Sequence, residues 1–150
     1  MTSNRKSFLR DTKGQSLVEF ALILPMMLVV MFMITEFGRA LYQYNVLATA
    51  CREGAREAVV SSSANAVSVG TARMNEILGK ANLQSGTTVT VTTDNNYQGT
   101  GTHVVIATAT RPFNWAFKGP MPVNAGAGAS TVSKKTLTLT GRSIMHSETF

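Results

Sequence analysis

The sequence predicts a membrane-anchored α+β protein with a long N-terminal helix, a short second helix and a small three-stranded antiparallel sheet. The first sign is that every residue from 20 to 34 is apolar except for one proline. The second is that threonine alternates with valine, alanine or leucine in stretches between residues 87 and 140, which is the two-residue period of a strand. Since 150 residues have room for one modest domain, we expect an apolar anchor followed by a small head.

The apolar anchor is long enough to cross a membrane. Leu17 to Thr35 make nineteen residues with one charge, Glu19, close to the start. At about 1.5 Å per residue, a helix of this length nearly matches a hydrocarbon core about 30 Å thick. The alternative, a core helix of a soluble protein, would need a polar face, and none exists between Phe20 and Ile34. The segment is therefore predicted to span.

The charges around the span predict its direction. Four basic residues precede it, whereas both signs are mixed after it. The positive-inside bias places residues 1 to 14 in the cytoplasm and the chain after about residue 40 across the membrane, in a bacterium the periplasm. The formal net charge of +6 is divided equally between the first fourteen residues and the remaining 136. Because no basic stripe interleaved with aromatic residues appears, no nucleic-acid partner is expected.

Two simple interpretations of the N-terminus leave something unexplained. An ordinary secretory signal would need a small-residue cleavage site near the membrane face, but Ala48-Thr49-Ala50 lies some fifteen residues beyond the apolar run. An uncleaved anchor explains the span and the charge bias but not Glu19. A carboxylate in an apolar run costs up to about 3 kcal/mol at mid-membrane, and such residues commonly have a function.

A third interpretation uses the residues around that carboxylate, in which Gly14 ends a basic leader and Glu19 is the fifth residue after it. This arrangement resembles the type IV prepilin signal, which a dedicated peptidase cuts after the glycine. More narrowly, residues 14–25 (GQSLVEFALILP) resemble the opening of the TadE-like family, minor pseudopilins of the tight-adherence (Flp) pilus system. The resemblance continues through residues 36–41 (EFGRAL) and 50–56 (ACREGAR).

The resemblance implies a pilin-like protein of the bacterial inner membrane that is cut between Gly14 and Gln15. It implies the following partners: the prepilin peptidase, other pseudopilins, the Flp pilin and the inner-membrane assembly platform. Gln15 departs from the phenylalanine or methionine with which mature major type IV pilins usually begin. The implied divisions are a cytoplasmic leader (1–14), a transmembrane segment (15–36), a continuation of the helix (37–60) and a periplasmic head (61–150).

The cut would give Glu19 and Gln15 a role in assembly. The new amine of Gln15 would lie one helical turn from the Glu19 carboxylate, so Glu19 of one subunit could pair with the Gln15 amine of a neighbour. The alternative is that Glu19 only reaches for the headgroups. Pro25 removes one backbone hydrogen bond inside the span, which is either a tolerated kink or a hinge used in assembly.

Beyond the span, an apolar stripe at alternating spacings of four and three predicts that the helix continues. The stripe consists of Phe37, Leu41, Tyr44, Ala48, Cys51, Ala55 and Ala58. Its narrowing to alanine would let another element approach closely, and Cys51 is interpreted as a small core or interface residue. A second helix is expected over residues 64 to 79, with Val67, Met74, Ile77 and Leu78 on its apolar side and Gly79 at its end.

Three strands are expected in the head, at Thr87–Thr93, His103–Thr110 and Lys135–Arg142, with a turn at residues 94–99. A longer alternative for the third strand runs on through Met145. A long connection, Arg111 to Ser133, contains three aromatic residues, Phe113, Trp115 and Phe117. These aromatics form either an exposed patch for a partner or the cover of a small core.

No catalytic or metal-binding pattern is found in the sequence. His103 and His146 have no cysteines or clustered carboxylates at ligand spacing, so we expect no enzyme activity and no cofactor or metal. The competing functional interpretation is an uncleaved single-pass periplasmic binding module. In that case residues 111–133 would carry the function, and Gly14 and Glu19 would be incidental.

Overall fold

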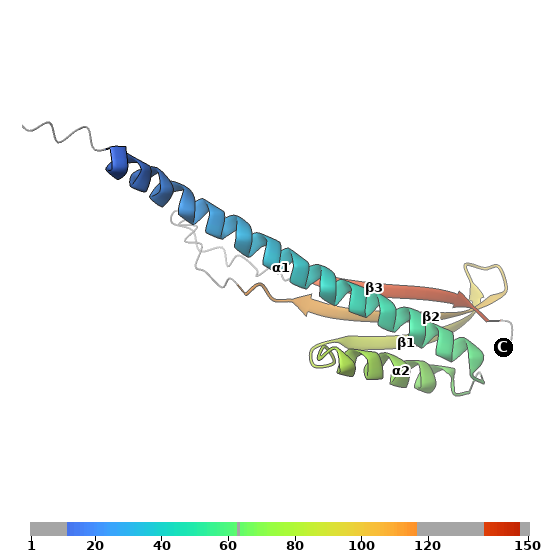
Figure 1. Cartoon of the computed structure of the whole chain (residues 1–150). Helices are drawn as coiled ribbons and strands as arrows, with labels where there is room; N and C mark the ends of the chain where they lie inside the picture. The colour runs from blue at the N-terminus through green and yellow to red at the C-terminus, as the bar shows by residue number, and fades with distance from the viewer. Residues whose placement is uncertain (1–11, 63, 117–136, 148–150) are drawn as a thin grey trace, which may run out of the picture. The chain divides into compact units, whose positions relative to one another are not determined.

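The computed structural model describes residues 12–62, 64–116 and 137–147. Within them the elements follow in the order α1 (Thr12–Val60), α2 (Ala66–Lys80), β1 (Thr88–Tyr97), β2 (Thr102–Phe113) and β3 (Leu137–His146) (Figure 1). The predicted α+β class, with a long N-terminal helix, a short second helix and a three-stranded antiparallel sheet, is confirmed. Most of the predicted leader, residues 117–133 of the predicted connection and the first two residues of the predicted third strand lie outside the described residues.

The chain divides into two compact units, Met1–Gly38 and Arg39–Phe150. In the first unit, α1 passes through Pro25 without a break, and residues 14 to 35 are exposed. Among the described residues, one helix is long and apolar enough to cross a membrane, and none of its most apolar stretch is buried. A core helix of a soluble protein would be buried there. Such a large bare apolar surface indicates that something other than this chain covers it.

In the second unit, the sheet has the order β1-β2-β3 with both pairs antiparallel. Its helix-facing side is built on alternate residues of the central strand, which are buried: Val105, Ala107 and Ala109. The opposite side carries exposed threonines such as Thr88, Thr90 and Thr92. This sidedness explains the period-two pattern, because an antiparallel sheet can pack one face on a core and leave the other in water.

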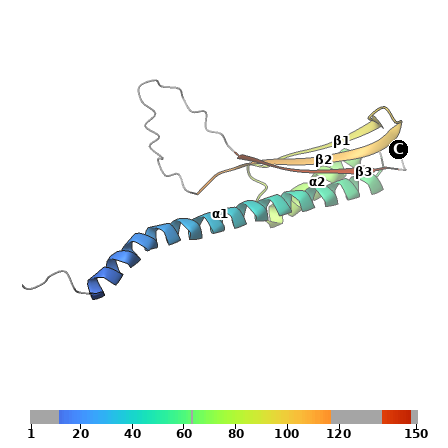
Figure 2. The same cartoon turned by 90° about the horizontal axis from the view of Figure 1, so that it is seen from above.

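Both helices cover the same face of the sheet (Figure 2), and small residues let them approach it closely. A Cβ atom added to Gly70 of α2 would lie 2.9 Å from the carbonyl oxygen of Gly54 in α1 and 3.0 Å from the Cβ of Ala58. A Cβ added to Gly141 of β3 would lie 2.9 Å from the carbonyl carbon of Leu47. These distances are shorter than carbon atoms tolerate, so three elements meet backbone to backbone at these glycines.

The predicted stripe on α1 is correct in its second half and wrong in its first. Cys51, Ala55 and Ala58 are fully buried, but Leu41 and Tyr44 remain 47% and 45% exposed. The apolar and small residues buried beside the correct half are Leu47, Ala50 and Gly54. The covered face of α1 is decided by the elements that pack on it, because α2 and the sheet bury Leu47, Ala50 and Cys51 but leave Leu41 and Tyr44 uncovered.

The end of α2 differs from the prediction. Gly79 lies inside the helix, and the residue in the left-handed conformation is Asn82, with φ of 58°. The Leu83 amide donates to the Leu78 carbonyl at 2.8 Å and the Asn82 amide to the Gly79 carbonyl at 3.0 Å, which is a Schellman cap. Asparagine adopts this conformation more readily than other side-chain-bearing residues, so it replaced the expected glycine. The buried residues of α2 recur every fourth position: Ala66, Gly70, Met74 and Leu78.

The hairpin turn and the start of the long connection were both predicted too early. β1 continues through the expected turn as far as Tyr97, with an irregular register between Asp94 and Tyr97. Positive φ angles occur at Gln98, Gly99 and Gly101, where the chain reverses. At its other end β2 continues to Phe113, because Phe113 pairs with Leu137 of β3.

Arg111 lies in β2 and joins the sheet to the segment that follows α2. Its guanidinium donates to the carbonyl oxygens of Leu83 and Ser85, both at 2.6 Å, and to the hydroxyl of Thr87 at 3.1 Å. Hydrogen bonds from a charged donor are stronger than neutral ones. This side chain therefore holds the connection between α2 and β1 against the central strand.

Cys51 is a fully buried core residue, as expected. Its thiol donates to the Gly141 carbonyl oxygen at 3.3 Å, which joins α1 to β3. Burial raises the pKa of the Cys51 thiol to about 11, with a smaller opposite effect from a hydrogen bond of the Ala109 backbone. The thiol is therefore neutral at physiological pH.

The glycine contacts predict opposite effects for two substitutions in the same helix. We expect Gly70→Ala to lower the free energy of unfolding by about 1–3 kcal/mol, because the new methyl group meets backbone atoms that cannot move away. Gly79→Ala is the matched control, because its methyl group would meet only the end of the Gln84 side chain at 3.6 Å. It is expected to be neutral or to stabilise by up to about 1 kcal/mol. Urea unfolding of the full chain in micelles measures both, and equal effects would contradict the proposed close contact.

Burial of Cys51 predicts slow and pH-dependent modification. Alkylation of the native protein by iodoacetamide at pH 8 is expected to be far slower than alkylation in urea, and the single cysteine makes the measured mass unambiguous. The pKa of the Cys51 thiol is about 11 in the folded chain and 9.0 ordinarily. Between pH 9 and about 11, therefore, the thiol is protonated in the folded chain and loses its proton on unfolding. Stability should therefore fall as pH rises from about 9 to about 11. Rapid native labelling at pH 8 would contradict the burial.

Candidate functional site

The residues predicted to be cut by the peptidase or to pair with a neighbouring subunit lie at the beginning of α1. The helix begins at Thr12, so Gly14 and Gln15 already belong to its first turn. The side-chain amide nitrogen of Gln15 donates to the Glu19 carboxylate at 3.2 Å. Both side chains are exposed. The structure thus brings Gln15 and Glu19 together, one turn apart on the same helix face.

Glu19 retains capacity for a further partner. An ionised carboxylate has two oxygens and can accept about four hydrogen bonds, and the Gln15 amide contacts one oxygen. The neighbouring residues on both sides, Val18 and Phe20, are apolar and exposed. The carboxylate therefore lies at the edge of an apolar surface, where a partner cation would be partly shielded from water.

Gly14 is not required by the fold around it. A Cβ atom added there would meet nothing within 4 Å, and the backbone is in the ordinary right-handed helical conformation. This contrasts with Gly54, Gly70 and Gly141, where a Cβ atom would clash. If glycine is needed at position 14, the reason lies in a molecule that binds the segment.

A cluster that the sequence did not indicate lies at the beginning of the second unit. Arg39 of α1 donates through Nη2 to the Asn114 carbonyl oxygen at 2.6 Å. Its guanidinium carbon lies 4.9 Å from the centre of the Phe113 ring. Phe113 in turn makes an edge contact with Trp115, with ring centres 5.2 Å apart. No local pattern signals a contact between residues 75 positions apart.

The aromatic residues of the long connection were interpreted either as the cover of a small core or as an exposed patch for a partner. Each interpretation is correct for one residue. Phe113 is buried, with 1% exposure, and so covers the core as one interpretation expected. Trp115 is 50% exposed, as the other expected. Phe117 lies outside the described residues.

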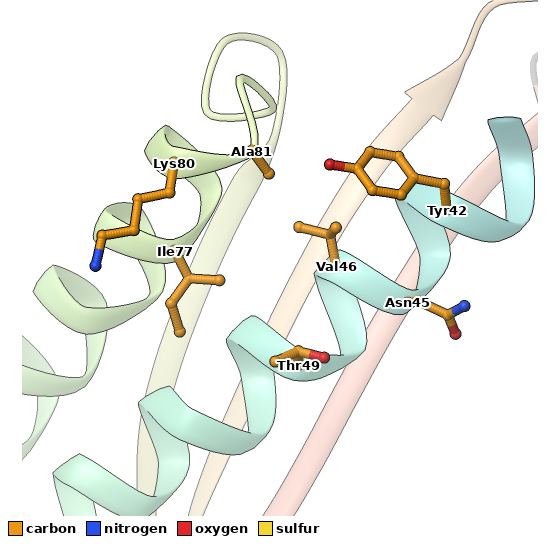
Figure 3. Close-up of a pocket in the computed structure, with 7 residues that line it drawn as sticks. All are labelled: Tyr42, Asn45, Val46, Thr49, Ile77, Lys80 and Ala81. Atoms are coloured by element: carbon orange, nitrogen blue, oxygen red, sulfur yellow. The ribbon is translucent and has the colours of Figure 1, made fainter.

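A shallow cavity of about 350 Å³ lies between α1 and α2 (Figure 3). It is lined by Tyr42, Asn45, Val46, Thr49, Ile77, Lys80 and Ala81. The Lys80 amine points away from α1 and binds the Glu76 carboxylate at 2.6 Å. Among the residues that the structure describes, no group of three or more His, Cys, Asp or Glu side chains could hold a metal ion. The lining offers an apolar surface and no pair of groups suited to acid–base chemistry.

Comparison with known proteins found a family that is similar to the N-terminal part of the chain. Residues 14–56 match the family model described as TadE-like protein. Searches of curated proteins and of solved structures gave no match. The matched residues contain Gly14, Gln15, Glu19 and Pro25, and they extend into the part of α1 that packs on the sheet. The resemblance found in the sequence is therefore confirmed over residues 14–56, which are similar to the TadE-like family.

Proposed function

We propose that this chain is a minor pseudopilin of a type IVb Flp/Tad pilus system, processed by a prepilin peptidase and required for pilus assembly and adherence. The observation that carries the proposal is the TadE-like match over residues 14–56. It coincides with an apolar helix whose surface the chain leaves bare. In this role the chain is a substrate of the peptidase and a component of the pilus-assembly system, and not an enzyme.

The proposed layout is a single pass through the inner membrane. Residues 1–14 form a cytoplasmic leader, residues 15–36 span the bilayer, residues 37–60 continue the helix and residues 61–150 form a periplasmic head. The charge bias before the span supports this direction. The proposed partners are the prepilin peptidase, other pseudopilins, the Flp pilin and the inner-membrane assembly platform.

Cleavage after Gly14 would change the charges at the start of the helix. In the uncut chain, Glu19 accepts a hydrogen bond from the neutral Gln15 amide. After the cut, Gln15 would also carry the terminal amine, a cation. A carboxylate and an amine are each costly to remove from water alone, but they attract strongly in an apolar setting. Pairing between Glu19 of one subunit and Gln15 of its neighbour would therefore favour one axial register over slipped ones.

The first test of this proposal concerns cleavage. Gly14→Leu is expected to leave a precursor that keeps its fourteen leader residues, seen by intact mass of the membrane-extracted protein. Because a Cβ at residue 14 meets nothing within 4 Å, loss of processing would not come from misfolding. Gly38→Leu is the matched control, since residue 38 is equally open in α1, and it should be processed normally. A mature wild-type chain that begins at Met1 or Cys51 would refute the proposal and, in the case of Met1, favour the uncleaved module.

The second test concerns Glu19. We expect Glu19→Ala to insert and to be processed, but to lose pilus assembly and co-purification of partner pseudopilins, because an unpaired amine would remain in the bundle. Glu19→Asp keeps the charge on a shorter side chain and should retain part of the function. Glu57→Ala, which removes an exposed carboxylate far along the same helix, is the control. Normal piliation by a stably expressed Glu19→Ala protein would rule out the pairing.

A further inference from the structure

We propose that Trp115 is a second membrane anchor, which inserts its indole into the headgroup layer of the bilayer that α1 crosses, and that Arg39 positions it. The proposal depends on the span in the proposed function. In this proposal the bilayer is contacted twice, by the helix that crosses it and by Trp115, which follows the end of β2 in the head.

The first step is the connection between the end of β2 and the start of the second unit. Arg39 binds the Asn114 carbonyl at 2.6 Å and lies over the Phe113 ring. Residues 113 and 114 directly precede Trp115, and the Phe113 ring also contacts the indole. Arg39 therefore holds Phe113 and Asn114, and with them the start of the chain after β2 that contains Trp115, close to α1.

The second step is the distance from Arg39 to the membrane. Arg39 follows Thr35, the last residue of the predicted span, by four positions. Four residues extend about 6 Å in a helix and at most about 14 Å when fully stretched. The headgroup layer is about 5–8 Å thick on each side of the hydrocarbon core. The short covalent tether thus keeps the Arg39 backbone within about 14 Å of the hydrocarbon edge, so Trp115, which Arg39 holds through Phe113 and Asn114, is within reach of this layer.

The third step is the chemistry of the indole. Trp115 is 50% exposed, although the Phe113 ring beside it is 1% exposed. An indole has a large apolar body and one N–H donor, so it is most favourable at the boundary between hydrocarbon and water. Two tyrosines of α1 just after Arg39, Tyr42 and Tyr44, are also exposed, by 56% and 45%. Exposed aromatic side chains near the end of a span are typical of a membrane-interface belt.

The test uses the intrinsic fluorescence of Trp115, because it is the single tryptophan of the chain. The full protein is reconstituted into phosphatidylethanolamine–phosphatidylglycerol vesicles that contain lipid brominated either near the headgroup or near the chain end. We expect quenching by the shallow bromine to exceed quenching by the deep bromine by about twofold or more, since an interfacial indole lies near the top of the acyl chains. Acrylamide in the water should quench weakly.

Other outcomes separate failure of the inference from failure of the span. Protein that resists carbonate extraction but shows strong acrylamide quenching and no bromine quenching would refute the membrane contact and leave the span intact. Quenching that depends on the protein-to-lipid ratio and not on bromine would also refute it, because a second protein copy would then cover Trp115. Protein that carbonate removes from the vesicles would refute the span itself.

Variants of Arg39 test its positioning role. Arg39→Ala should raise acrylamide quenching and lower shallow bromine quenching, because the end of β2 is no longer held. Arg39→Lys can still donate to Asn114 and lie over Phe113, so it should restore part of the signal. Arg52→Ala removes an exposed arginine from the same helix and should change nothing. An unchanged quenching pattern in Arg39→Ala protein with a normal circular-dichroism melt would refute the role of Arg39.

Discussion

The head depends on the close approach of three backbones, in α1, α2 and β3, at positions that have no side chain. Gly54 and Gly70 let the two helices touch, and Gly141 lets β3 lie against the backbone of α1 at Leu47. The core around them is made mainly of alanine, valine and single larger residues such as Met74. Such a core buries little area for each residue, so it gains its cohesion from short contact distances. A single added methyl group therefore disturbs it more than it would a core of large side chains.

The same helix serves two surroundings because its composition changes along its length. Residues 17 to 34 carry large apolar side chains that the chain leaves exposed, whereas residues 47 to 58 turn small side chains toward the sheet. Large apolar side chains suit contact with lipid tails, which are as apolar as leucine. Small side chains suit a contact with a twisted sheet, where the backbones must come close. The TadE-like match covers both parts up to residue 56.

Features governed by local sequence could be predicted, and features governed by distant contacts could not. The apolar run and the alternation of threonine depend on periodicity, and both led to the correct elements. The residue that terminates α2 was misplaced by three positions, from Gly79 to Asn82, because Asn82 can adopt a conformation that usually requires glycine. The Arg39 cluster could not be predicted, since it joins residues far apart in the sequence. The side of α1 that is buried was misjudged before Leu47 because the sheet and α2, not the sequence spacing, decide which face is covered.

The glycines of α1 differ in whether the packing of the chain requires them. Gly54 is required by packing, because Met74 and the Gly70 carbonyl occupy the space where its Cβ would lie. Gly14 has open space around it, and the Glu19 carboxylate accepts an exposed hydrogen bond from the neighbouring Gln15. A carboxylate at the edge of an apolar span adds a cost of insertion and gains little from one exposed hydrogen bond. The part of the fold that the structure describes gives no reason for either residue, so the reason for both is sought in molecules that bind this end of the helix, as the proposed cleavage and pairing require.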